Sequence, residues 1–164
     1  PLFSNVTVPG ALYTVYTLWH IVNGPIKQQL NEYTSKVYLE KKWQNYFASS
    51  QIPNYQEYFL KHLSQTEIIS FKEKIIELLS AEDDFIPHYA IDVLQSNVFQ
   101  DPVQYNPIIE RLDKLKPHVI TEILNTLSGY NQQTKAILGK FKDSPKASAK
   151  QKEIIEKIIN YEEQ

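Results

Sequence analysis

The sequence predicts an all-α protein, a single compact domain of about eight or nine amphipathic helices. Apolar residues recur at helical spacing in one segment after another, and N-cap residues, glycines and prolines separate these segments. No segment alternates apolar and polar residues over a useful length, as a half-buried strand would. We expect the aromatic-rich half, residues 1–63, to pack on the shorter helices of residues 64–164, so that residues 1–164 form one domain.

The N-terminal segment is distinguished by its lack of charge. None of the 17 Lys and Arg or 19 Asp and Glu residues lies within residues 1–26. A glycine and a proline at 24 and 25 supply a helix C-terminus, so a helix is predicted from about residue 10 to residue 23. Its apolar face repeats at i, i+3, i+4 and i+7 and consists of Leu12, Val15, Tyr16 and Trp19.

This uncharged helix is expected to be buried rather than to cross a membrane. Its apolar centre, residues 8–22, is shorter than the roughly 20 residues that a spanning helix needs, and His20 interrupts it. It also lacks the basic start of a secretory signal peptide. We therefore expect no transmembrane segment, and we expect the helix to pack on the core or on a pocket with Trp19 shielded from solvent.

The following segments continue the helical pattern to residue 79. Residues 25–48 are predicted to form one long helix, because an apolar stripe runs through them without a glycine or proline after the start. Asn54, with a glutamate three residues later, predicts the N-cap of a short aromatic helix. Ser64 and Glu67 predict a capping box, whose helix extends to Leu79.

Caps and prolines divide the second half into shorter helices. The acidic residues 82–84 precede a helix start, where the helix dipole favours negative charge. Asp101 and Asn106 each precede a proline and are therefore predicted N-caps. Pro117 is predicted to end one helix, and another follows it. Ser148, with a glutamine three residues later, is predicted to cap the final helix.

Four short segments resemble parts of the nematode polyprotein allergens and related small helical secreted proteins. These segments are residues 60–65, 71–72, 141–147 and 156–161. That family consists of helical carriers that bind fatty acids and retinol in an apolar interior, so the resemblance implies a helical fold, lipid binding and secretion rather than a cytoplasmic location. The chain lacks the cysteines that some members of the family carry, and its spacing between the similar parts differs from theirs. The first 50 residues resemble no part of the family.

Neither a catalytic nor a metal-binding signature is present in the sequence. The 4 histidines are well separated, none has a second histidine or a cysteine one helical turn away, and no HExxH occurs. The absence of cysteine excludes disulfides and thiolate zinc sites. No GxSxG or phosphate-binding glycine loop is found. We therefore expect neither an enzyme nor a metal or cofactor site.

The charge distribution argues against nucleic acid as a partner. The net charge is −2, and nucleic-acid binding normally requires clustered Lys and Arg. Residues 135–157 are locally basic, but no aromatic side chains alternate with their lysines to stack on bases. We interpret this basic segment as solvated helix faces.

Two functions from different classes remain open. The first is binding of a small apolar ligand, such as a fatty acid or retinoid, in a helical interior, where Arg111 or a lysine would pair with a carboxylate. The second is a helical interaction module or assembly subunit, whose residues 10–23 dock on a protein partner or a membrane surface. Ordinary core packing is the alternative explanation for the aromatic residues. The candidate ligand-binding residues are Tyr16, Trp19, Trp43, Phe59, Phe71 and Arg111.

Overall fold

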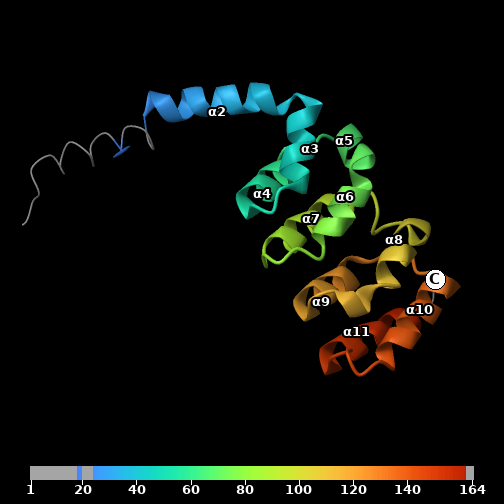
Figure 1. Cartoon of the computed structure of the whole chain (residues 1–164). Helices are drawn as coiled ribbons and strands as arrows, with labels where there is room; N and C mark the ends of the chain where they lie inside the picture. Colours follow the sequence, from blue (N-terminus) through green and yellow to red (C-terminus); the bar gives the residue numbers. More distant parts are fainter. Residues whose placement is uncertain (1–17, 20–23, 162–164) are drawn as a thin grey trace, which may run out of the picture. The chain divides into compact units, whose positions relative to one another are not determined.

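All regular elements in the described part of the chain are helices (Figure 1). The computed structural model describes residues 18–19 and 24–161, and between Pro25 and Ile159 it contains ten α-helices, α2 to α11, and a short 3-10 helix, η1. The all-α prediction is confirmed. None of the helices in these ranges is long and apolar enough to cross a membrane. Of the predicted helix 10–23, only Leu18 and Trp19 are described, and both are helical.

The chain divides into two units, residues 1–46 and residues 47–164, and each is described by itself. The division falls within α3 (Lys41–Ser49). The predicted packing of residues 1–63 on residues 64–164 therefore stays a prediction for the first 46 residues.

The first unit contains a break that the sequence pattern did not indicate. The predicted helix 25–48 is divided into α2 (Pro25–Tyr38) and α3 by a turn at Leu39 and Glu40. The carbonyl of Glu40 accepts hydrogen bonds from the amides of Trp43 and Gln44, at 2.8 and 3.4 Å, and so starts the new helix. Because neither glycine nor proline marks this turn, helical periodicity alone could not reveal it.

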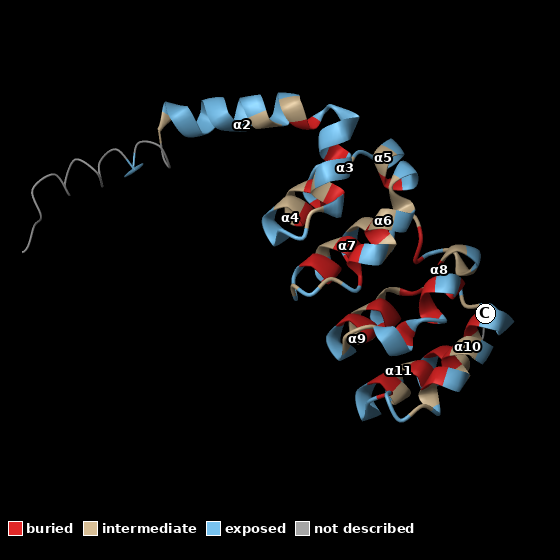
Figure 2. Cartoon of the chain, viewed as in Figure 1, coloured by how far each residue is buried: buried red, intermediate tan, exposed pale blue. Residues whose placement is uncertain are grey.

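Helix α2 lies with most of its surface in solvent (Figure 2). The apolar side chains of Ile26, Leu30 and Tyr33 are exposed, and Tyr38 is the buried residue of this helix. An apolar stripe at this spacing usually faces a core. Its exposure on α2 indicates that this face of the helix can contact another molecule.

The second unit is a stack of helices in two rows, in the manner of α-solenoids (Figure 1). In the first row, each helix packs on the next: α4 (Pro53–Lys61), α7 (Ile86–Gln95), α9 (Pro117–Thr126) and α11 (Ala149–Ile159). Facing them, the second row contains α5 (Gln65–Ser70), α6 (Lys72–Leu78), α8 (Pro102–Ile109) and α10 (Gln132–Lys142). Helix α6 packs on α7, and α10 packs on both α8 and α11.

The core of this unit lies between the two rows (Figure 2). Both rows contribute large side chains that are fully buried: Phe59, Ile75, Leu94, Phe99, Tyr105, Leu112, Ile123, Leu138 and Ile155. Gln151 is a buried polar residue, and its amide nitrogen donates to the Pro117 carbonyl at 2.8 Å, which links α11 to α9. The interior of the stack is thus filled by packed side chains.

Three predicted helix caps are confirmed. Ser64 and Ser148 each form a capping box, and their backbone amides donate to Glu67 at 2.8 Å and to Gln151 at 2.9 Å. Asp101 caps α8 by accepting from the amide of Val103 at 3.0 Å. Side-chain oxygens thereby satisfy amides that the first helical turn leaves free.

Three local predictions are wrong. The N-cap of α4 is Ile52 and not Asn54, because Pro53 occupies the first helical position, which its fixed φ angle suits. Asn106 lies inside α8 rather than at a helix start. The predicted helix from Ser64 to Leu79 is interrupted at Phe71, one residue after Ser70 Oγ bonds back to the Thr66 carbonyl at 3.1 Å, a contact that bends helices.

Candidate ligand-binding groove between α6 and α8

A groove of about 550 Å³ lies between α6 and α8, and we call it the α6–α8 groove. Its apolar lining combines buried Leu79 and Ile108 with Val103, whose side chain is 77% exposed. The remaining lining residues are Lys72, Glu73, Ile76, Glu77, Ser80, Gln104, Pro107, Arg111, Lys114 and Leu115. The groove therefore offers an apolar floor within a charged rim.

Local folding places two cations at the rim. Helix α8 ends at Ile109, and the chain continues into η1 (Leu112–Lys114). Because Leu112 is fully buried and anchors this turn, its neighbours Arg111 and Lys114 stay at the surface. The charged group of neither side chain has a hydrogen bond or ion pair with any of residues 24–161.

The other charged residues of the groove are partly engaged with the protein. Lys72 Nζ donates to Gln104 Oε1 at 3.2 Å and so links α6 to α8 across the groove. Glu77 forms an ion pair of 2.6 Å with Lys74. Glu73 is the other carboxylate that lines the groove. Arg111 and Lys114 are thus available to an anionic group of a ligand.

The predicted ligand-binding residues occupy several places. Arg111 lines the α6–α8 groove. Phe59 and Phe71 lie side by side, with ring centroids 5.2 Å apart and ring planes at 84°, but they do not line this groove. Trp43 belongs to the first unit and contacts Tyr46 edge to face. Tyr16 lies outside the described residues.

Trp19 contradicts one expectation. Its side chain is 56% exposed, so the expectation that it is shielded is wrong. Leu18 beside it is exposed as well. Exposed apolar side chains at these positions are what a docking segment requires and what a core helix avoids.

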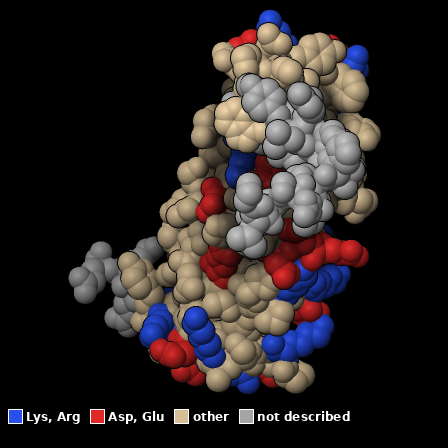
Figure 3. Space-filling view, turned by 90° about the vertical axis from the view of Figure 1, so that its left-hand side faces the viewer, with Lys and Arg blue, Asp and Glu red and all other residues tan. Residues whose placement is uncertain are grey.

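Three lysines of the basic segment 135–157 form ion pairs with carboxylates. Lys142 pairs with Glu156 at 3.6 Å, and Lys157 pairs with Glu153 at 2.7 Å. Lys146 reaches Asp113 at 3.4 Å. On the face shown in Figure 3, Lys and Arg side chains lie among Asp and Glu side chains in the lower part of the view. This distribution favours solvated helix faces over a phosphate-binding surface.

Sequence reasoning missed one cluster of side chains. His88, Asp92 and Glu122 bring possible metal-ligand atoms within 4.8 Å of one another. The sequence contains part of the signal, because Asp92 follows His88 by one helical turn, but an aspartate at that spacing is a weaker indication of a metal site than a second histidine or a cysteine. Glu122 comes from another helix, so its proximity requires the fold.

Comparison with known proteins gives no information about the function of the chain. No family model, curated protein or solved structure matches the chain. The fold is a stack of helices, and the α6–α8 groove lies on its surface.

Proposed function

We propose that the chain is a non-catalytic binding protein that holds a small apolar ligand with a carboxylate, such as a fatty acid, in the α6–α8 groove. The observation that carries this proposal is the combination of an apolar floor with Arg111 and Lys114, two cations without a protein partner among residues 24–161. The ligand lies in a surface groove in this proposal and not among the core aromatics, because Phe59 is packed against Phe71.

Size and chemistry support this ligand class. Small-molecule sites usually have volumes of about 300 to 1,000 Å³, and the groove, with about 550 Å³, lies within that range. Each methylene transferred from water to the floor contributes about 0.8 kcal/mol. The planar guanidinium of Arg111 matches a carboxylate with paired hydrogen bonds, which orients the ligand head at the rim.

Reversing the charge of Arg111 should weaken fatty-acid binding. We expect Arg111→Glu to lower the affinity of delipidated protein for oleate by at least about tenfold, because a paired cation is replaced by a repelling carboxylate. Oleyl alcohol, which lacks the carboxylate, should bind the variant and the original protein equally. Isothermal titration calorimetry measures both affinities, and oleate should also raise the melting temperature of the original protein.

Lys140→Glu supplies the matched control. Lys140 is exposed on α10 and does not line the α6–α8 groove, so its charge reversal should leave oleate affinity unchanged. Val103→Asp, at an exposed position in the lining, should weaken oleate and oleyl alcohol alike. The proposal fails if the original protein does not bind oleate, or if Arg111→Glu and Val103→Asp both bind it normally.

The exposed face of α2 supports a second function, that of a helical interaction module. Apolar residues on this helix are spaced by four, three and four positions, the pattern of a coiled-coil seam: Ile26, Leu30, Tyr33 and Val37. The seam is flanked by Lys27 and Lys36. A second copy of α2 offers no acidic residue at the positions that flank its seam, whereas a partner helix with acidic flanks would neutralise these lysines. The partner proposed here is therefore an acidic amphipathic helix.

Designed peptides test this second function. A heptad peptide with leucine at the seam and glutamate at the flanking positions should bind the full chain, and its counterpart with lysine at those flanks should not. Leu30→Ser should lower the affinity by at least about tenfold, while Asn31→Ser, on the neighbouring face, should not. Fluorescence anisotropy measures both. Equal binding of the two peptides would exclude this partner, as would a stable dimer of the chain in sedimentation.

A further inference from the structure

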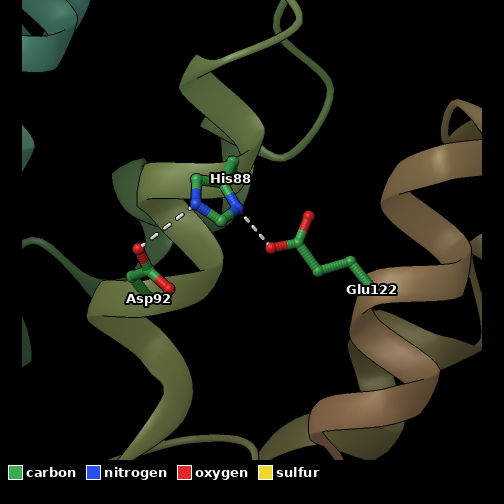
Figure 4. A group of neighbouring side chains, drawn as sticks. All are labelled: His88, Asp92 and Glu122. Atoms are coloured by element: carbon green, nitrogen blue, oxygen red, sulfur yellow. Dashed lines mark hydrogen bonds and ion pairs between the residues drawn. The ribbon is translucent and has the colours of Figure 1, made fainter.

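His88 lies between two carboxylates on the surface of the second unit (Figure 4). Asp92 follows it by one turn of α7, and its Oδ2 lies 3.7 Å from Nε2 of the histidine. On the other side of the ring, Nδ1 is hydrogen-bonded to Oε1 of Glu122, which comes from α9. Each ring nitrogen therefore faces a different carboxylate.

The surroundings of the imidazole favour positive charge. The hydrogen bond with Glu122 raises the pKa of His88 above its ordinary value, burial opposes this effect, and the charges of Glu122 and Asp92 add to it. The three side chains are partly exposed, so a hydrated cation can reach them from solvent. The same two carboxylates that favour a proton on the ring would also attract a metal cation.

We propose that His88 Nε2 and the Asp92 carboxylate bind a divalent transition-metal ion of the Zn²⁺ type, and that Glu122 positions the imidazole by accepting Nδ1–H. Histidines that bind metals usually donate their other ring N–H to a carboxylate, which fixes the tautomer with the lone pair on the coordinating nitrogen. Glu122 lies at the nitrogen where this contact is needed.

The distances suit this assignment. Zinc bonds to nitrogen and oxygen measure about 2.0 to 2.2 Å, so two ligand atoms in a tetrahedral site are roughly 3.4 Å apart. The observed 3.7 Å between Nε2 and Oδ2 requires only a small side-chain movement. Imidazole together with carboxylate selects a transition metal over Mg²⁺ or Ca²⁺, which prefer oxygen ligands alone. Water or a group from a partner would complete the coordination.

Titration of the full chain with ZnCl₂ tests this site, and it does not depend on the function of the groove. We expect one zinc ion per chain by calorimetry and no comparable binding of MgCl₂. His88→Ala and Asp92→Asn should each lower the affinity by at least about tenfold, and Glu122→Gln should do so through the orientation of the ring. Circular dichroism checks that these variants at exposed or half-exposed positions remain folded.

His62→Ala is the matched control, since His62 is an exposed histidine beside α4 whose Nδ1 lies 2.8 Å from the Tyr58 carbonyl. It should leave zinc affinity unchanged. In nitrogen-15 spectra, zinc should shift Nε2 of His88 while Nδ1 remains protonated, and Glu122→Gln should alter this tautomer signal. Unchanged zinc affinity in His88→Ala, or coordination through Nδ1, would overturn the proposal.

Discussion

Truncation of Phe59 to alanine should lower the free energy of unfolding by about 3 to 5 kcal/mol. Phe59 is 0% exposed, and its ring packs edge to face on Phe71 at 5.2 Å. Helix α4, which carries it, packs on α7, so the lost ring would leave a cavity near the contact between these helices. Urea unfolding followed by circular dichroism measures the change.

Phe85→Ala is the matched control for this prediction. The same ring is removed, but Phe85 is 70% exposed at the start of α7, so the unfolding free energy should change by no more than about 0.5 kcal/mol. Equal losses in the two variants would mean that the core of the second unit does not have the packing described here.

The sequence predicts helix starts well where the signal is chemical and local. Ser64, Asp101 and Ser148 are confirmed caps, because each side chain satisfies amides within three residues along the chain. Asn54 and Asn106 show the limit of the same reasoning. Both side chains could cap a helix. However, α4 already starts at Pro53, before Asn54, and α8 is already capped by Asp101, before Asn106.

Helix breaks were harder to predict than helix starts. The turns at Leu39 and at Phe71 interrupt apolar stripes that continue on both sides, and no glycine or proline accompanies them. Periodicity depends only on the spacing of apolar residues, and this spacing continues through both turns, so it does not register them. Ser70 is a weak indication of the break at Phe71, because a serine side chain can hydrogen-bond to a carbonyl one turn earlier and bend the helix.

The candidate sites depend on contacts between residues that are distant along the chain. Arg111 could be selected from the sequence as the single arginine, but its apolar surroundings come from α6 and α8, which only the fold brings together. Glu122 likewise meets His88 across 34 positions of sequence. No spacing rule for one helix could predict either arrangement.

Replacing Thr134 by valine should destabilise the second unit by about 1 to 3 kcal/mol. Thr134 is fully buried at the start of α10, and its Oγ1 lies 2.8 Å from Oδ1 of Asn106 in α8. Valine keeps the shape of threonine but removes the hydroxyl, so the buried Asn106 oxygen would lose this partner. Chemical denaturation of the full chain measures the loss.

Thr134→Ser separates the hydrogen bond from the packing. Serine keeps the hydroxyl and loses one methyl group, so it should cost only about 1 kcal/mol. If the contact between Thr134 and Asn106 joins α10 to α8, amides in both helices should exchange faster in the valine variant than in the serine variant. A serine variant that is less stable than the valine variant would show that the methyl group, and not the hydroxyl, holds these two helices together.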